Sequence, residues 1–162
     1  MKKPVIDRTK LPEVMEIIEE ANSLMTEKDC ESDEAAKKEL EEMQNRLREI
    51  TGNHQIIIRD FWHYDAATDL KTVAEGALMS PPEKENITDE QMKEIVVNIL
   101  KHGEAELDWW LKYLELNTGL VNLSDYIFYP DSVGLDRNSS LEQIADKIIT
   151  DRKNIHQQIV HL

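Results

Sequence analysis

Five histidines and one cysteine are the side chains of this chain best suited to metal binding or acid–base chemistry. His63 lies between Asp60 and Asp65, so these three residues are a conceivable metal-binding or acid–base cluster. No His-Glu-x-x-His motif occurs, and no second ligand stands at a suitable helical spacing. We therefore interpret His63 as a solvated or core histidine and expect no metal. Cys30 is alone, which rules out an internal disulfide and a zinc–thiolate cluster.

Other motifs of catalysis are absent or weak. The chain has no glycine-rich phosphate loop and no nucleophile elbow. It also lacks the Glu-x-x-His pairs that build di-metal sites in helical bundles. Asp131-Ser132-Val133 resembles the modified serine site of acyl carrier proteins, but no helix is expected to begin there. We expect no enzyme and no cofactor, with an acyl-carrier-like or small-molecule-binding helical protein as an alternative.

The charge favours a protein partner over nucleic acid. The net charge is −14, whereas binding to a phosphate backbone needs clustered lysine and arginine. Both halves share this excess, with 11 basic and 19 acidic residues up to residue 83 and 8 and 14 after it. An acidic surface speeds the approach of a basic partner, although acidity also serves solubility alone.

The bulk composition predicts an all-α, water-soluble protein. Hydrophobic residues make up 40% and charged residues 32%, and glycine and proline number only five each, which favours long helices. No apolar run reaches the roughly 18 residues of a membrane span, and residues 1–7 do not form a signal peptide. We therefore expect a cytoplasmic location and no membrane contact. Pro81-Pro82 predicts a boundary between units 1–82 and 83–162.

The second half predicts four helical segments. Thr88 to Gln91 forms a capping box, and the apolar spacing after it predicts a helix up to Gly103. A second helix is expected over 104–118, with Gly119 at its end. A short segment 122–130 and a loop 131–138 follow. The residues expected to face inward from the last helix, which Ser139 or Ser140 caps, are Leu141, Ile144, Ala145, Ile148 and Ile149.

The first half repeats this order more loosely. Helical stripes begin at Leu11 and at Ala36, separated by an acidic loop 27–34. A segment 56–64 and a short helix 69–78 follow. Thr51-Gly52 corresponds to Thr118-Gly119 at the end of the second helix. Asp60 to Tyr64 stands where Asp125 to Tyr129 stands later, sharing an Asp-x-x-x-Tyr pattern. We interpret the chain as a tandem repeat of two four-helix units.

The most unusual stretch is Ser124-Asp125-Tyr126-Ile127-Phe128-Tyr129-Pro130. It resembles the Ser-Asp-Leu-Ile-Tyr-Tyr-Pro signature of the immunity proteins that inhibit colicin- and pyocin-type DNases. The residues around Thr88 resemble the start of that family's first helix. Residues 104–118 and 140–152 resemble its acidic second helix and its last helix, so the resemblance covers about 88–152. The first half resembles the family only through its likeness to the second.

The resemblance implies a four-helix fold with a very short third helix. It also implies an inhibitor that binds a basic nuclease toxin beside its active site, so that shape and negative charge keep DNA out. Pairs of this kind are among the tightest complexes known. An interaction module without a toxin partner is a further alternative.

The resemblance also implies the residues that bind the partner. The anchor on the third helix corresponds to Asp125, Phe128, Tyr129 and Pro130. The specificity face on the second helix corresponds to Glu104, Leu107, Asp108, Leu111, Lys112 and Glu115. The first-repeat equivalents of the anchor are Asp60, His63 and Tyr64.

Two features of these positions come from the residues themselves. Aromatic side chains on a short, stiff segment bury a large area at a low entropy cost, which suits a binding hot spot. Phe128 stands where the family has tyrosine, so one hydroxyl is missing. Asp125 is also a candidate helix cap, and Leu107 and Leu111 also fit the apolar stripe, where they would be buried. Arg48 of the first half stands where Glu115 stands, which reverses the charge.

Overall fold

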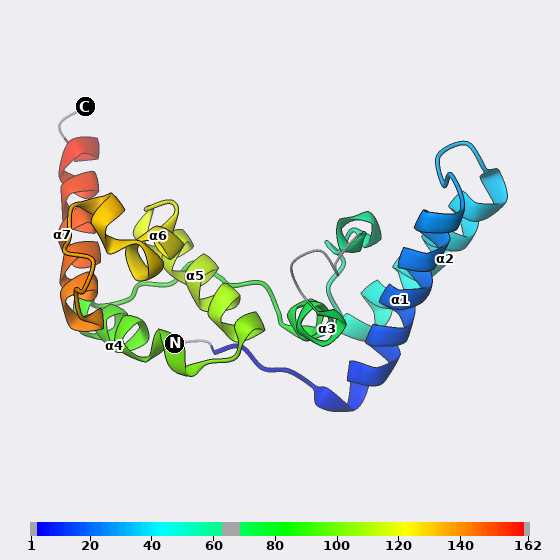
Figure 1. The fold of residues 1–162 in the computed structure, drawn as a ribbon, viewed down its shortest axis with the longest axis horizontal. Helices are drawn as coiled ribbons and strands as arrows, with labels where there is room; N and C mark the ends of the chain where they lie inside the picture. Colours follow the sequence, from blue (N-terminus) through cyan, green and yellow to red (C-terminus); the bar gives the residue numbers. More distant parts are fainter. Residues whose placement is uncertain (1–2, 63–68, 161–162) are drawn as a thin grey trace. The chain divides into compact units, whose positions relative to one another are not determined.

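The protein is all-helical in the computed structural model, which describes residues 3–62 and 69–160 (Figure 1). The described residues contain no strand, so the predicted all-α class is confirmed. The α-helices are α1 (Leu11–Glu27), α2 (Glu34–Thr51), α3 (Leu70–Leu78), α4 (Asp89–Asn98), α5 (Glu104–Thr118), α6 (Leu123–Phe128) and α7 (Leu141–Val160). The short 3-10 helices are η1 (Arg8–Lys10), η2 (Ile58–Phe61), η4 (Ile99–Lys101) and η5 (Pro130–Val133). Among the helices of these two ranges, none has the length and apolar composition needed to cross a membrane.

The chain divides into two compact units. Pro4–Ser80 forms the N-terminal unit, and Pro81–Leu162, together with Met1–Lys3, forms the C-terminal unit. The Pro81-Pro82 pair directly follows the division. Proline cannot continue a helix or donate a backbone hydrogen bond, which suits a connector between separately packed cores.

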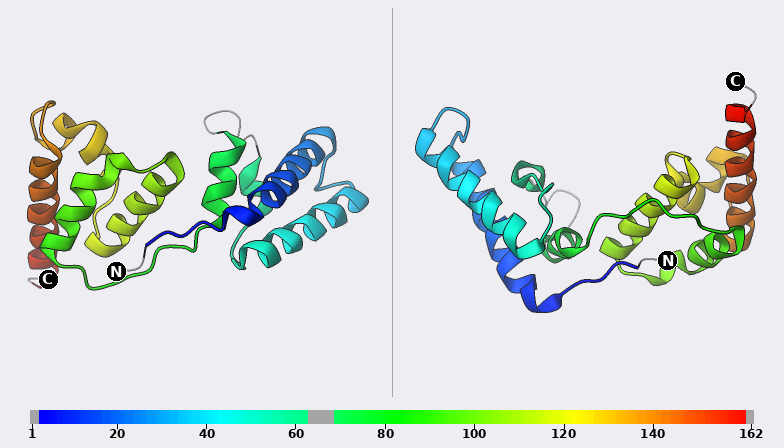
Figure 2. Two further views of the ribbon diagram at one scale, coloured as in Figure 1. Left: turned by 90° about the horizontal axis from the view of Figure 1, so that it is seen from below. Right: turned by 180° about the vertical axis from the view of Figure 1, so that it is seen from behind.

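In the N-terminal unit, α1 is the central element. It packs against α2, α3 and η2, and it lies alongside α2 in both views of Figure 2. Pro12 stands in its first turn, where the missing N–H is not needed. Val14, Ile17 and Ile18 follow at helical spacing and are fully buried, so one stripe of α1 faces all its neighbours.

In the C-terminal unit, α4 packs against α7, and α6 contacts both α5 and α7. The predicted capping box is present, because Gln91 N donates to Thr88 Oγ1 at 3.1 Å and Thr88 N donates to Gln91 Oε1 at 3.0 Å. Ser140 and Gln143 form the same reciprocal pair before α7. Both caps satisfy amides that the first helical turn leaves without partners.

Of the apolar stripe predicted for α5, which is Leu107, Trp110, Leu111 and Leu114, only Trp110 and Leu114 are buried. Trp109, Trp110 and Tyr113 are buried, whereas Leu107 and Leu111 are only half-buried. The Tyr113 ring stacks on Trp109 and meets Trp110 edge-on, with centroids 5.4 Å apart in both cases. Large aromatic rings bury more apolar area than leucine, so this cluster determines which side of α5 faces the core.

The second helix of each unit ends in the same way. Gly52 ends α2 with φ +69°, and Gly119 ends α5 with φ +75°. Just before each glycine, a threonine hydroxyl donates to the carbonyl four residues back, at 2.7 Å in Thr51 and in Thr118. Glycine is favoured here because other residues pay a steric penalty at positive φ.

The side chain four residues before each glycine holds the segment that follows. Arg48 Nε donates to the Ile56 carbonyl at 2.9 Å, and Glu115 Oε1 accepts from the Leu123 amide at 3.2 Å. Both bonds span eight residues. The two positions carry opposite charges because their partners differ. Arg48 binds a backbone carbonyl, and Glu115 binds a backbone amide.

The third elements of the two units differ. The C-terminal unit has the six-residue helix α6, whereas the N-terminal unit has the 3-10 helix η2. The predicted loop 131–138 is also not fully irregular, because η5 occupies its first part. A 3-10 turn closes with fewer residues than an α-helical turn and serves as a short connector.

Two glycine substitutions, one at a left-handed helix end and one inside a helix, should have opposite effects on stability. Gly119→Ala should lower the free energy of unfolding by about 1–2 kcal/mol, because alanine is strained at positive φ. Gly76→Ala, inside α3 with open space at its Cβ position, should raise it by about 0.5–1 kcal/mol. Urea unfolding followed by circular dichroism measures both, and equal effects of one sign would contradict the assignment.

Candidate protein-binding surface

The segment around α6 has a buried side and an exposed side. Tyr126 and Ile127 are buried, whereas Phe128 is 48% exposed and Tyr129 is 64% exposed. Pro130 is buried again at the start of η5. One turn of helix directs successive side chains to different sides, so the core holds the segment while two aromatic rings face solvent.

Side chains of α5 and α7 hold α6 in place. Glu115 accepts from the Leu123 amide at the first residue of α6. The Tyr126 hydroxyl donates to Asp151 at 2.7 Å, and Lys147 lies 3.2 Å from the same carboxylate. Buried polar groups cost stability unless they are hydrogen-bonded, so these contacts allow Tyr126 to pack inward.

Bonds to the Tyr129 carbonyl shape the exit from α6. Ser132 donates to it from its backbone amide at 2.9 Å and from its hydroxyl at 2.7 Å. The Leu135 amide donates to the Pro130 carbonyl at 3.0 Å. Ser132 therefore closes a 3-10 turn, and the next long helix begins only at Leu141. This geometry gives no support to the acyl-carrier alternative.

The predicted specificity face of α5 is partly exposed. Glu104, Asp108 and Lys112 are exposed, and Lys112 Nζ lies 2.8 Å from the Asp108 carboxylate. Exposed pairs of this kind contribute at most about 1 kcal/mol, so both side chains remain able to exchange partners. Leu107 and Leu111 are half-buried beside the aromatic cluster and offer only part of their surface.

Three predicted site residues have structural roles. Glu115 is half-buried and holds the start of α6, as described above. Pro130 is buried, so it fixes the backbone after Tyr129 and offers little surface to a partner. Asp125 is half-buried in the first turn of α6, where a carboxylate interacts favourably with the helix dipole. The N-cap of α6 is Asn122 and not Asp125.

The first-repeat equivalents are described only in part. Asp60 is exposed on η2, whereas His63 and Tyr64 lie outside the described residues. In the described ranges, no three His, Cys, Asp or Glu side chains lie close enough together to hold a metal ion.

Some exposed apolar residues were not predicted from the sequence. Leu116 on α5 and Val121 before α6 are exposed, and Trp62 after η2 is half-exposed. Leu116 falls off the apolar stripe of α5, which is the signal that marks an exposed apolar residue on a helix. Val121 and Trp62 lie outside helices, where periodicity gives no signal.

Two buried tyrosines have raised pKa values. Burial raises the pKa of Tyr113 well above the usual 10.0, and its hydrogen bond to the Glu85 carboxylate raises it further. Burial and the Asp151 carboxylate raise the pKa of Tyr126 in the same way. An ionised phenol beside a carboxylate would place two negative charges together, so both hydroxyls stay protonated.

Comparison with known proteins found no matching family model, no matching curated protein and no matching solved structure. The candidate surface therefore rests on its residues and its geometry.

The raised pKa values predict loss of stability in alkali. Above pH 10 the unfolded chain releases the two tyrosine protons while the folded chain keeps them, so rising pH favours unfolding. At pH 11 the loss should be at most about 1.4 kcal/mol for each tyrosine, and solvent screening reduces it. Urea unfolding at pH 8 and pH 11 measures it. Tyr126→Phe should lose less stability between these pH values than the wild type, and an unchanged loss would contradict the assignment.

Proposed function

We propose that the protein is an acidic protein-binding inhibitor of the immunity type, which neutralises a nuclease-type toxin by binding beside its active site. The proposal follows the resemblance of residues 88–152 to DNase immunity proteins. It assigns no catalytic role to the chain.

The observation that carries the proposal is the exposure of Phe128 and Tyr129 on a firmly held segment. Their neighbours Tyr126 and Pro130 are buried, and hydrogen bonds fix both ends of α6. Two large rings exposed on a rigid support bind a partner without a large loss of conformational entropy. This combination is typical of an interface hot spot.

Charge supports a basic partner. Glu104 and Asp108 are exposed on α5, and the whole chain carries −14. A nuclease surface built to bind phosphate is positively charged and complements these carboxylates. An acidic inhibitor bound beside the active site would then repel the DNA backbone from it.

The proposal includes a tandem origin for the two units. The matched Thr-Gly helix ends support it, as do the two eight-residue bonds from Arg48 and Glu115. The C-terminal unit contains α4 to α7, whereas the N-terminal unit has η2 at the place that corresponds to α6. We assign toxin binding to the C-terminal unit, which keeps the aromatic pair.

Substitution of the anchor tests the proposal. Tyr129→Ala should weaken toxin binding by more than about 2 kcal/mol while leaving the helical content unchanged, because the removed ring is exposed. The intact protein is used to capture partners from a lysate of its native cell, and calorimetry then measures the affinity of the captured protein. The captured protein must be a basic nuclease whose DNA cleavage the wild type inhibits.

Val121→Ala is the matched control, since Val121 is exposed but lies outside the proposed anchor. It should bind as the wild type does. Equal loss of helicity and binding in Tyr129→Ala would show that the ring supports the fold. Failure to capture a basic nuclease at low salt would refute the toxin assignment.

Salt should act mainly on the rate of association. Charge attraction speeds the encounter, and salt screens it, with a Debye length of about 10 Å at 0.1 M. Stopped-flow mixing of the protein with the nuclease should show association slowing at least tenfold between about 0.02 M and about 0.5 M salt. An association rate independent of salt would exclude the electrostatic part of the proposal.

A further inference from the structure

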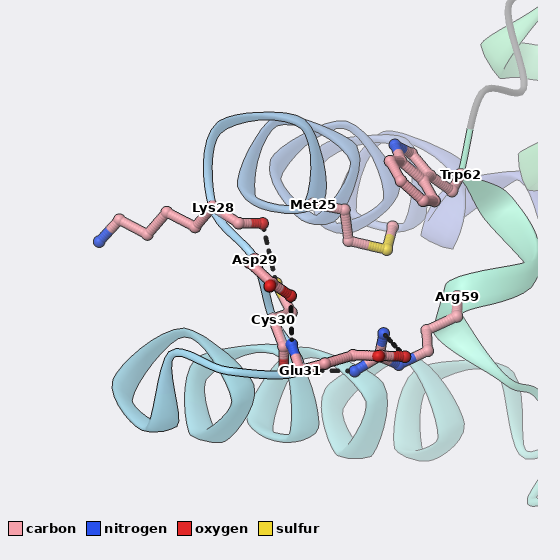
Figure 3. A pocket seen from close by; sticks show the side chains of 7 residues that line it. All are labelled: Met25, Lys28, Asp29, Cys30, Glu31, Arg59 and Trp62. Carbon is pink, nitrogen blue, oxygen red and sulfur yellow. Dashed lines mark hydrogen bonds and ion pairs between the residues drawn. The ribbon is translucent and has the colours of Figure 1, made fainter.

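The N-terminal unit carries an open groove of its own, about 470 Å³ in volume (Figure 3). It lies between the end of α1, the loop that joins α1 to α2, and η2 with the residue after it. We call it the Trp62 groove; its lining residues are Met25, Lys28, Asp29, Cys30, Glu31, Arg59 and Trp62.

The surface of the Trp62 groove is mostly apolar. Figure 3 shows the Trp62 indole beside the Met25 side chain, with Arg59 and Glu31 across the opening. Met25 is buried, whereas Trp62 is half-exposed. An indole and a thioether adapt well to an inserted apolar side chain. The volume lies at the small end of the range for ligand sites, which suits a few side chains of a peptide.

The Arg59 guanidinium contacts the loop between α1 and α2. Its Nη2 donates to the Cys30 carbonyl at 3.4 Å, and its Nη1 lies 3.8 Å from the Glu31 carboxylate. The guanidinium thus has partners within the unit, while the Glu31 side chain is 84% exposed. The carboxylate is the charge at this edge that a partner from solvent meets first.

The surroundings of the groove are strongly acidic. Residues 27–34 contain five carboxylates and one cation, Lys28, and Asp60 is exposed on η2. In Figure 3 the Lys28 side chain points away from the groove. The Ser32 hydroxyl and the Glu31 amide donate to Asp29 and hold the pKa of its carboxyl below its usual value, so it stays ionised.

The acidic rim of the Trp62 groove favours a positively charged binding partner. A second copy of the chain carries −14 and would meet repulsion, and an anionic ligand would meet the same carboxylates. A cationic segment gains attraction from the carboxylates at the rim. We infer that the Trp62 groove receives a large apolar side chain from a lysine- or arginine-rich segment of another protein. The inference does not rest on the proposed toxin binding, which uses the other unit.

Peptide selection tests the inference. A phage-displayed library of random twelve-residue peptides is selected on the intact chain carrying Tyr129→Ala, so that the C-terminal aromatic anchor is removed. The selected peptides should contain a large apolar residue flanked by at least two lysines or arginines. Fluorescence anisotropy of the labelled peptides then measures their affinity for further variants.

Trp62→Ala in the same background should weaken binding at least tenfold, and Glu31→Gln at least threefold. Ile57→Ala is the matched control, because Ile57 is equally exposed beside η2 but does not line the groove, and it should leave binding unchanged. Enrichment of acidic or neutral peptides, no enrichment, or equal binding by Trp62→Ala would overturn the inference. It would also be overturned if sedimentation showed a dimer that Trp62→Ala dissolves, since the occupant would then be a second copy.

Discussion

A helix of six residues does not hold its shape in isolation, and α6 depends on contacts from α5 and α7. Glu115 bonds to its first amide, and Asp151 accepts from the Tyr126 hydroxyl. These two carboxylates orient the one turn that separates buried rings from exposed ones. The proposed role of the C-terminal unit depends on that separation, because it leaves Phe128 and Tyr129 exposed.

The helices were predictable where local chemistry determines them. The Thr88–Gln91 cap, Pro12 and the left-handed glycines act through bonds between near neighbours, which can be recognised from residue spacing alone. The buried side of α5 was less predictable. Leu107 and Leu111 lie on a different side of the helix from Trp109 and Tyr113, and only packing against the rest of the unit selects between the two sides.

The residues of the candidate site could be predicted from the sequence. Which of them support the fold rather than face solvent could not. The Asp125–Pro130 segment stands out by its aromatic content, and the exposure of Tyr129 follows from the limited room in one turn. Glu115 and Pro130 support the fold instead, because their partners lie in other elements that spacing does not reveal. The Trp62 groove was not predicted at all, since its lining comes from three separate parts of the chain.

The opposite charges of Arg48 and Glu115 would affect recombination between the two halves. If the two halves descend from one ancestral sequence, recombination between them would produce hybrid units. A hybrid that joins α2 to the segment of α6 sets the Arg48 guanidinium against the Leu123 amide, donor facing donor. The reverse hybrid sets the Glu115 carboxylate against the Ile56 carbonyl, acceptor facing acceptor. Each second helix is thus matched to its own third segment, and in a duplicated chain this mismatch would oppose exchange of sequence between the two halves and let their surfaces diverge.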